Sequence, residues 1–79
     1  NPKTVINYEV IEQGFVSINI FDLNGLLVKN IIQKDHFAGN HSITWDGKNE
    51  SGIKVASGNY FYTLKANNFS ETKKVIILK

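Results

Sequence analysis

The sequence predicts an all-β domain, and three observations support that fold class. Apolar and polar residues alternate with a period of two in several segments, whereas a helical period is hard to find. Turn-forming dipeptides of glycine, asparagine and aspartate recur at short intervals between those segments. The segments themselves are rich in β-branched and aromatic residues, which favour strands. The length of 79 residues suits one domain spanning residues 1–79.

Five segments show the strand pattern. In the second, Val16, Ile18 and Ile20 share one face, and in the fourth Tyr60 and Tyr62 do so together with the aliphatic residues that follow. In order along the chain, the segments are TVINYEV (4–10), FVSINIFD (15–22), HSITWDG (41–47), NYFYTLKA (59–66) and TKKVIILK (72–79).

One segment is ambiguous. LLVKNIIQKDHF (26–37) fits a short amphipathic helix with Leu27 and Ile31 facing inward, and it also fits a strand. Its β-branched residues and its strand neighbours favour the strand.

The turns and the strand count together predict the architecture. Asn24-Gly25 and Asp46-Gly47 suit the positive backbone angles of tight turns. About seven short strands in 79 residues predict a small antiparallel β-sandwich of immunoglobulin-like type. The sequence has no cysteine and hence no disulfide, so the ring of Trp45 is expected to fill more of the core.

Composition excludes several classes of function. The net charge is only +2, and every basic residue is lysine, so the forked arginine contacts that read bases or clamp phosphates are missing. This argues against nucleic acid as a partner. Without cysteine, there is no thiolate zinc site and no cysteine nucleophile. The longest apolar run, Val75 to Leu78, is far shorter than the roughly 20 residues that span a bilayer.

The stretch TWDGKNESGIKVASGNYFY (44–62) raises the question of a calcium loop. An EF-hand loop beginning at Asp46 requires a ligand at its third position, glycine at its sixth and glutamate at its twelfth, but the sequence has Lys48, Ser51 and Ser57 there. A looser surface calcium site made by Asp46, Asn49 and Glu50 stays open. The sequence favours a plain turn, in which the Asp46 side chain accepts hydrogen bonds from nearby backbone amides.

Neither a catalytic nor a metal centre is predicted. Asp35, His36 and His41 would act together only if their loop folded back on itself, and they are interpreted as polar residues flanking a hairpin loop. The sequence lacks the G-x-S-x-G nucleophile motif. We therefore predict no enzymatic activity, no cofactor and no metal. Carbohydrate binding by exposed aromatic residues, with Phe61 and Phe69 as candidates, stays open.

The order of several short motifs resembles a known family. These are Asp22-x-x-Gly25 before LLV, Trp45-Asp46-Gly47, Ala56-Ser57-Gly58-x-Tyr60 and the closing KVIILK (74–79). Together they resemble the type A C-terminal sorting domain of the type IX secretion system of Bacteroidota, over essentially all 79 positions. A similar pattern occurs in the immunoglobulin-like domain of the flagellar hook-capping protein. Leu26 departs from the family, which commonly has arginine there.

The resemblance implies a non-catalytic, folded secretion signal. Such a domain directs a cargo protein, attached N-terminally, through the periplasm and across the outer membrane of a Gram-negative bacterium to the surface or the medium. Its implied partners are the secretion machinery and a sortase-like peptidase that cleaves it off. The implied recognition residues are Gly25 and the six residues of the last strand: Lys74, Val75, Ile76, Ile77, Leu78 and Lys79. We expect this strand to pair with a strand of the receptor.

The alternatives are a flagellar-type scaffold, an unspecific immunoglobulin-like spacer and a carbohydrate-binding module of a larger secreted protein. A sorting domain is expected to end its native protein at or near Lys79, which distinguishes it from these alternatives.

Overall fold

The computed structural model describes residues 3–78 and confirms the all-β fold class. It contains six strands and, within residues 3–78, no helix, so no helix there is long and apolar enough to cross a membrane. The strands are β1 (Thr4–Val10), β2 (Gly14–Phe21), β3 (Leu27–His36), β4 (Gly39–Trp45), β5 (Gly58–Ala66) and β6 (Phe69–Ile77). The expected number of about seven was too high by one, because residues 46–57 form loops joined only by an isolated bridge between Lys48 and Lys54.

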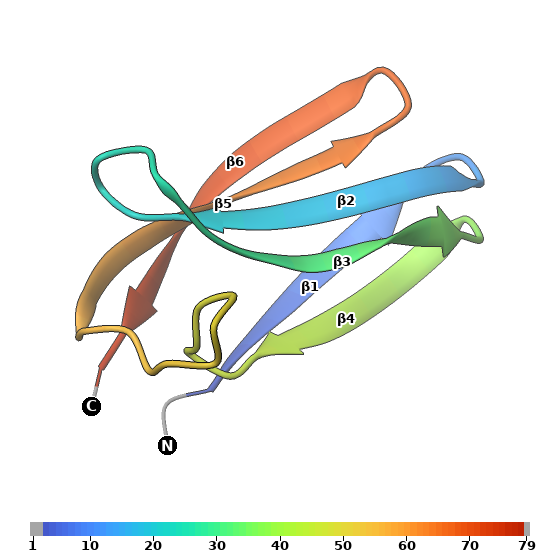
Figure 1. The fold of residues 1–79 in the computed structure, drawn as a ribbon. Coiled ribbons are helices and arrows are strands. Elements are labelled where there is room, and N and C mark those ends of the chain that lie inside the picture. Colours follow the sequence, from blue (N-terminus) through green and yellow to red (C-terminus); the bar gives the residue numbers. More distant parts are fainter. Residues whose placement is uncertain (1–2, 79) are drawn as a thin grey trace.

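The strands form two antiparallel sheets. The larger has the order β3-β2-β5-β6, and the smaller pairs β1 with β4. Figure 1 shows the β1–β4 pair on one side of the larger sheet, which leaves the opposite face of the larger sheet uncovered. The architecture is therefore the predicted antiparallel sandwich, without a disulfide.

The core lies between the sheets and is made by the alternation that the sequence predicts. The buried hydrophobic side chains come from every strand except β3, which contributes half-buried hydrophobic residues and the buried His36. They are Ile6, Tyr8, Val10, Val16, Ile18, Ile20, Trp45, Tyr60, Tyr62, Leu64, Val75 and Ile77. Burying such side chains stabilises the fold by roughly 1.5–3 kcal/mol each before the cost of ordering the chain.

Two aromatic residues close one end of the core. The rings of Trp45 and Tyr60 are tilted against each other with centroids 5.5 Å apart. The Trp45 indole Nε1 donates to the Lys48 carbonyl at 3.0 Å, and the Tyr60 hydroxyl donates to the Ala56 carbonyl at 2.6 Å. The second bond fixes the entry into β5 as a tyrosine corner does in immunoglobulin-like domains.

The ambiguous segment is a strand, as favoured, but it is irregular. The register between β2 and β3 shifts twice, so that Val28 and Ile31 have no residue opposite them. Each bulge reverses the face of the side chains beyond it, so the two together restore the original alternation. Leu27, which the helical interpretation placed inward, lies opposite Phe21 on the outer face of the sheet and is 55% exposed.

Candidate interaction surface

Two turns of the same construction lie beside each other at one end of the sandwich. In residues 22–26, the Asp22 carboxylate accepts from the amides of Asn24 and Leu26 at 2.9 and 3.0 Å. In residues 49–53, the Asn49 side-chain oxygen accepts from the amides of Ser51 and Ile53, both at 3.0 Å. In each turn, a short polar side chain bonds the backbone amides two and four residues on, and two backbone hydrogen bonds support the same turn.

Both turns have a glycine at the same place and an exposed aliphatic residue after it. Gly25 and Gly52 have φ angles of 82° and 79°, a region that side chains with a Cβ rarely adopt. The residues that follow, Leu26 and Ile53, are 65% and 63% exposed. A hollow of about 440 Å³ lies between the two turns, and Leu27 lines it as well as Leu26.

The three calcium candidates are not assembled into a cation site. The Asp46 carboxylate accepts from the Lys48 amide at 3.1 Å, which confirms the predicted turn, and lies 3.9 Å from the Lys29 ammonium. Asn49 and Glu50 also already accept hydrogen bonds from backbone amides. Residues 3–78 contain no group of three or more metal-ligating side chains.

The histidines lie on either side of residues 37–38, but this connection joins strands of different sheets and is not the expected hairpin loop. His36 is also buried, with only 6% of its surface exposed. His36 Nδ1 lies 3.0 Å from the Lys34 carbonyl, which accepts, so in the neutral ring Nε2 accepts from the Tyr8 hydroxyl at 2.7 Å. Burial raises the pKa of Tyr8 above its ordinary value. The ring of His41 stacks on Tyr8 with centroids 5.6 Å apart.

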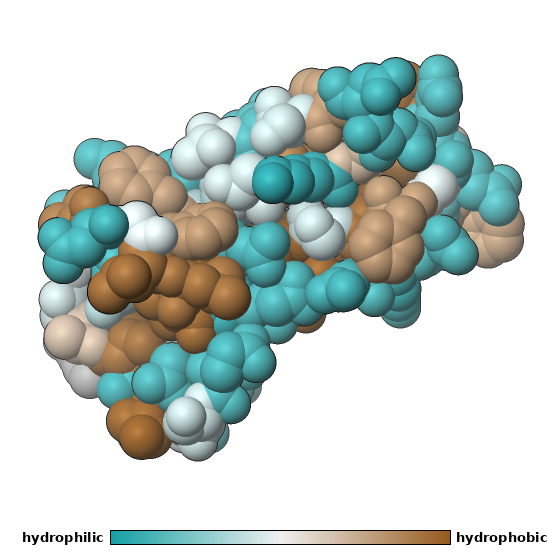
Figure 2. All heavy atoms as spheres, turned by 45° about the horizontal axis from the view of Figure 1, so that its top comes forward, coloured by the Kyte–Doolittle hydropathy of each residue, from teal (hydrophilic) through white to brown (hydrophobic). Residues whose placement is uncertain are grey.

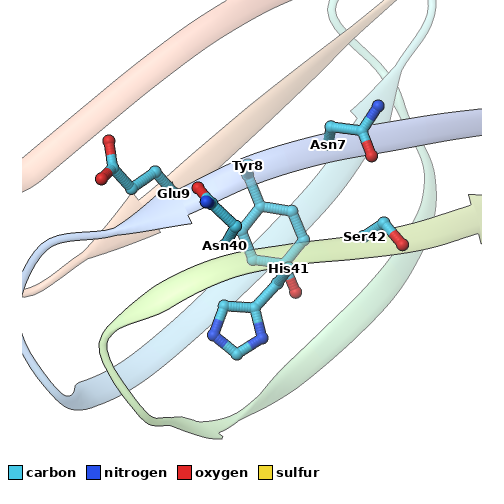
Figure 3. A pocket seen from close by; sticks show the side chains of 6 residues that line it. All are labelled: Asn7, Tyr8, Glu9, Asn40, His41 and Ser42. Carbon is cyan, nitrogen blue, oxygen red and sulfur yellow. The ribbon is translucent and has the colours of Figure 1, made fainter.

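Tyr8 and His41 border an open hollow on the surface. Figure 3 shows the ring of Tyr8 between strands β1 and β4, with the ring of His41 projecting from β4 beside it. The hollow has a volume of about 550 Å³. Asn7, Glu9, Asn40 and Ser42 complete its lining. The hydroxyl of Tyr8 is bonded to His36, so the group is a satisfied core contact.

The six residues predicted on the last strand divide between the two faces of the sheet. Val75 and Ile77 are buried in the core, whereas Ile76 is 54% exposed on the outer face. Lys74 and Leu78 are also exposed, and Lys79 lies outside the described residues. Gly25 lies in the turn between β2 and β3, so it is two strands away from β6 in the larger sheet.

The uncovered face of the larger sheet carries an exposed apolar patch, a feature that sequence reasoning missed. Leu27, Phe21 and Phe61 stand in one row across β3, β2 and β5. Figure 2 shows hydrophobic side chains gathered at the end of this face near the 22–26 turn. We define the apolar patch as Phe21, Leu23, Leu26, Leu27, Phe61 and Ile76. Exposed patches of this kind mark contact surfaces.

Comparison with known proteins places the chain in a family. Residues 11–70 match the FlgD Ig-like domain family. The basal-body rod modification protein FlgD of Salmonella typhimurium is 36% identical over 53 residues, which are 67% of this chain and 23% of that protein. The chain therefore spans less than a quarter of the length of this curated relative.

Solved structures share the fold. FlgD of Xanthomonas campestris, described as a hook-capping protein essential for flagellar assembly, is 30% identical with a TM-score of 0.67, over 96% of this chain and 54% of that one. FlgD of Pseudomonas aeruginosa has a TM-score of 0.75 over 95% of this chain and 59% of that one. At 23% identity, the second likeness shows the fold alone.

These findings overturn the function expected from the sequence. The similarity to the hook-capping protein is confirmed, but relatives and structural neighbours are flagellar proteins, not type IX secretion signals. For the same reason, the expected partners are wrong: the outer-membrane secretion machinery, the peptidase and the N-terminal cargo. The expected location, at the surface or in the medium after export across the outer membrane, is also wrong. So are the spacer and carbohydrate-binding alternatives. The motifs led to the wrong function because short turn-and-strand patterns indicate a fold and do not identify the partner that binds it. The chain belongs to the FlgD Ig-like domain family.

Proposed function

We propose that residues 1–79 are a single non-catalytic protein-binding domain of a flagellar hook-capping protein. The observation that carries the proposal is the family match over residues 11–70, together with the 36% identity to a flagellar FlgD protein. The names of these relatives describe flagellar assembly and no enzymatic activity. In this role, the domain acts in the flagellar structure and binds other proteins of the hook.

The apolar patch is the surface that we assign to this contact. It lies on the face that the β1–β4 pair leaves uncovered, and its members Leu26 and Leu27 are 65% and 55% exposed. Aromatic and aliphatic side chains grouped at one end of a rigid sheet supply the desolvated centre that protein interfaces use. Phe61 lies in the row with Leu27 and Phe21 and is half-buried, so its side chain is already held in place by the sheet. It therefore contributes apolar contact area with little loss of side-chain entropy on binding.

A domain exchange tests this function. The corresponding segment of the Salmonella typhimurium FlgD protein is replaced by residues 1–79, and motility in soft agar and hooks in electron micrographs are scored in a strain that lacks its own FlgD. We expect hooks to form. The same junctions carrying the Xanthomonas campestris domain are the positive control, because that domain comes from a hook-capping protein. Hooks with the control but none with a stably produced exchange protein would contradict the proposal.

A matched pair of variants then tests the patch. Phe61→Ser removes an aromatic side chain from the apolar patch, whereas Phe37→Ser removes one that is 76% exposed and lies outside it. We expect Phe61→Ser to reduce hook formation and Phe37→Ser to leave it unchanged, with both domains folded at the temperature of the assay as measured by thermal unfolding. Equal hook formation by both variants would contradict the assignment of the apolar patch as the contact surface.

A further inference from the structure

The two edges of the larger sheet differ in how their backbone groups are satisfied. At the β3 edge, the amide of Glu50 donates to the Val28 carbonyl at 3.1 Å, and the Glu50 carboxylate accepts from the Asn30 amide at 2.7 Å. The Asn30 side chain also donates to the Ile32 carbonyl at 3.3 Å. A loop and a side chain therefore close this edge against a further strand.

At the other edge, β6 pairs only with β5 among the described residues. The β5–β6 loop has two residues, with Ala66 opposite Phe69. In a hairpin with such a loop the closing pair is hydrogen-bonded, and bonded and non-bonded pairs then alternate along the strands. Lys73 therefore directs its backbone amide and carbonyl to β5, while Thr72 and Lys74 direct theirs to the open edge.

The charges along β6 select one partner for this edge. We propose that β6 pairs antiparallel with β6 of a second copy of this chain, centred on Thr72. In this register Glu71 of each copy lies opposite Lys73 of the other. The two side chains are on the same side of the strand, since they form an ion pair 3.7 Å apart within one copy. Opposite charges facing each other across two strands stabilise the pairing, and here there are two such contacts.

Neighbouring registers are disfavoured by the same charges. A centre on Glu71 places two carboxylates opposite each other, and a centre on Lys73 or Lys74 places two ammonium groups opposite each other. Like charges directly opposite destabilise a strand pair. The lysines that protect this edge from unspecific pairing thus also specify the register with an identical strand.

The pairing joins two sheets of four strands each into one continuous antiparallel sheet of eight strands. It also places Phe69, which is 50% exposed, opposite Val75 of the second copy. The apolar patch lies on the face of the sheet and not on its edge. The inference therefore does not depend on the proposed function, and either can fail alone.

Sedimentation velocity of the 79-residue chain over a range of concentrations tests the charge pairing. We expect a monomer–dimer equilibrium for the unaltered chain. Glu71→Lys or Lys73→Glu alone turns two attractive contacts into two repulsive ones and is expected to raise the Kd roughly tenfold. The double variant Glu71→Lys with Lys73→Glu restores opposite charges and is expected to restore the Kd. A chain that stays monomeric at millimolar concentration, or a double variant no better than the single ones, would overturn the proposal.

A backbone variant tests the edge itself. Thr72→Pro removes the one amide at the centre of the proposed pairing without removing an amide that bonds β5. Thr72→Ala is its control, because both variants lose the bond between the Thr63 and Thr72 hydroxyls at 3.1 Å. We expect the proline variant to be monomeric and the alanine variant to dimerise. Circular dichroism establishes that both are folded, and dimerisation of a folded proline variant would refute pairing through this edge.

Discussion

The carboxylate of Glu50 accepts a hydrogen bond from the backbone amide of Asn30 at 2.7 Å, which ties the 46–57 loop to the edge of β3. Residues 20 positions apart in the sequence thereby close one edge of the sheet. Glu50, a candidate calcium ligand in the sequence, instead bonds backbone groups at the edge of β3.

Replacing Glu50 is therefore expected to weaken that edge. Glu50→Ala leaves the Asn30 amide without its partner, and we expect a loss of about 1 kcal/mol in the free energy of unfolding, since the site is exposed to water. Glu50→Gln keeps an acceptor oxygen and is expected to recover most of the loss. Urea denaturation measures both, and equal stabilities of the alanine variant and the unaltered chain would count against this role.

The turns at residues 22–26 and 49–53 have the same construction, so replacing their glycines is expected to cost the same free energy of unfolding. Gly25→Ala and Gly52→Ala each force a Cβ into a positive φ, at 82° and 79°, with no neighbouring atom within 4 Å of the new carbon. The cost is therefore one of backbone conformation alone, about 1–2 kcal/mol at each position. Thermal unfolding of the two variants is expected to give the same decrease in Tm, and a clear difference between them would show that the turns are not equivalent.

Hydroxyl groups on β5 are expected to differ in their contribution. Tyr60→Phe removes the bond to the Ala56 carbonyl and is expected to cost about 1 kcal/mol of the free energy of unfolding. Tyr62→Phe is the control, because the Tyr62 hydroxyl makes no hydrogen bond to the described part of the chain. Chemical denaturation measures the free energy of unfolding of both variants. Equal losses would argue against a stabilising role of the bond between the Tyr60 hydroxyl and the Ala56 carbonyl.

The buried Tyr8 hydroxyl predicts a pH dependence at the alkaline end. Burial raises the pKa of Tyr8 above its ordinary value of 10.0, so the folded protein holds the proton more tightly than the unfolded chain does. The stabilisation is complete below pH of about 10 and is lost as pH rises from there through the folded pKa. Tyr8→Phe removes this titrating group.

The measurement for this prediction is the free energy of unfolding between pH 8 and 12 for the unaltered chain and for Tyr8→Phe. We expect a shallower decline above pH of about 10 in the variant. At neutral pH, the variant is expected to lose about 1–3 kcal/mol, because the His36 ring nitrogen loses its partner. If the free energy of unfolding fell equally steeply with pH in the two proteins, Tyr8 would not be the cause of the alkaline loss of stability.

Local patterns in the sequence sufficed for much of the fold. Val16, Ile18 and Ile20 alternate with polar residues, and all three are buried with none of their surface exposed. Asp46 bonds the Lys48 amide as its turn predicts. These features depend on the period of a strand and on contacts between near neighbours, which the order of the residues expresses directly.

Features that depend on distant residues could not be read in this way. Leu27 lies opposite Phe21 because two register shifts displace β3, and a bulge has no fixed signature in one sequence. His36 is buried because Tyr8, 28 residues away, meets its ring. The apolar patch also stayed hidden, since its members belong to different strands and become neighbours only in the assembled sheet.

By itself, the sequence determined the strands, the turns and the sandwich class, because alternation and turn chemistry act within a few residues. Only the tertiary structure decided which edge of the larger sheet is closed and which is open. Glu50 reaches β3 and nothing comparable among the described residues reaches β6, a difference set by the path of the chain between the sheets. Edges and faces exist only once strands are ordered side by side, and that order is a property of the whole fold.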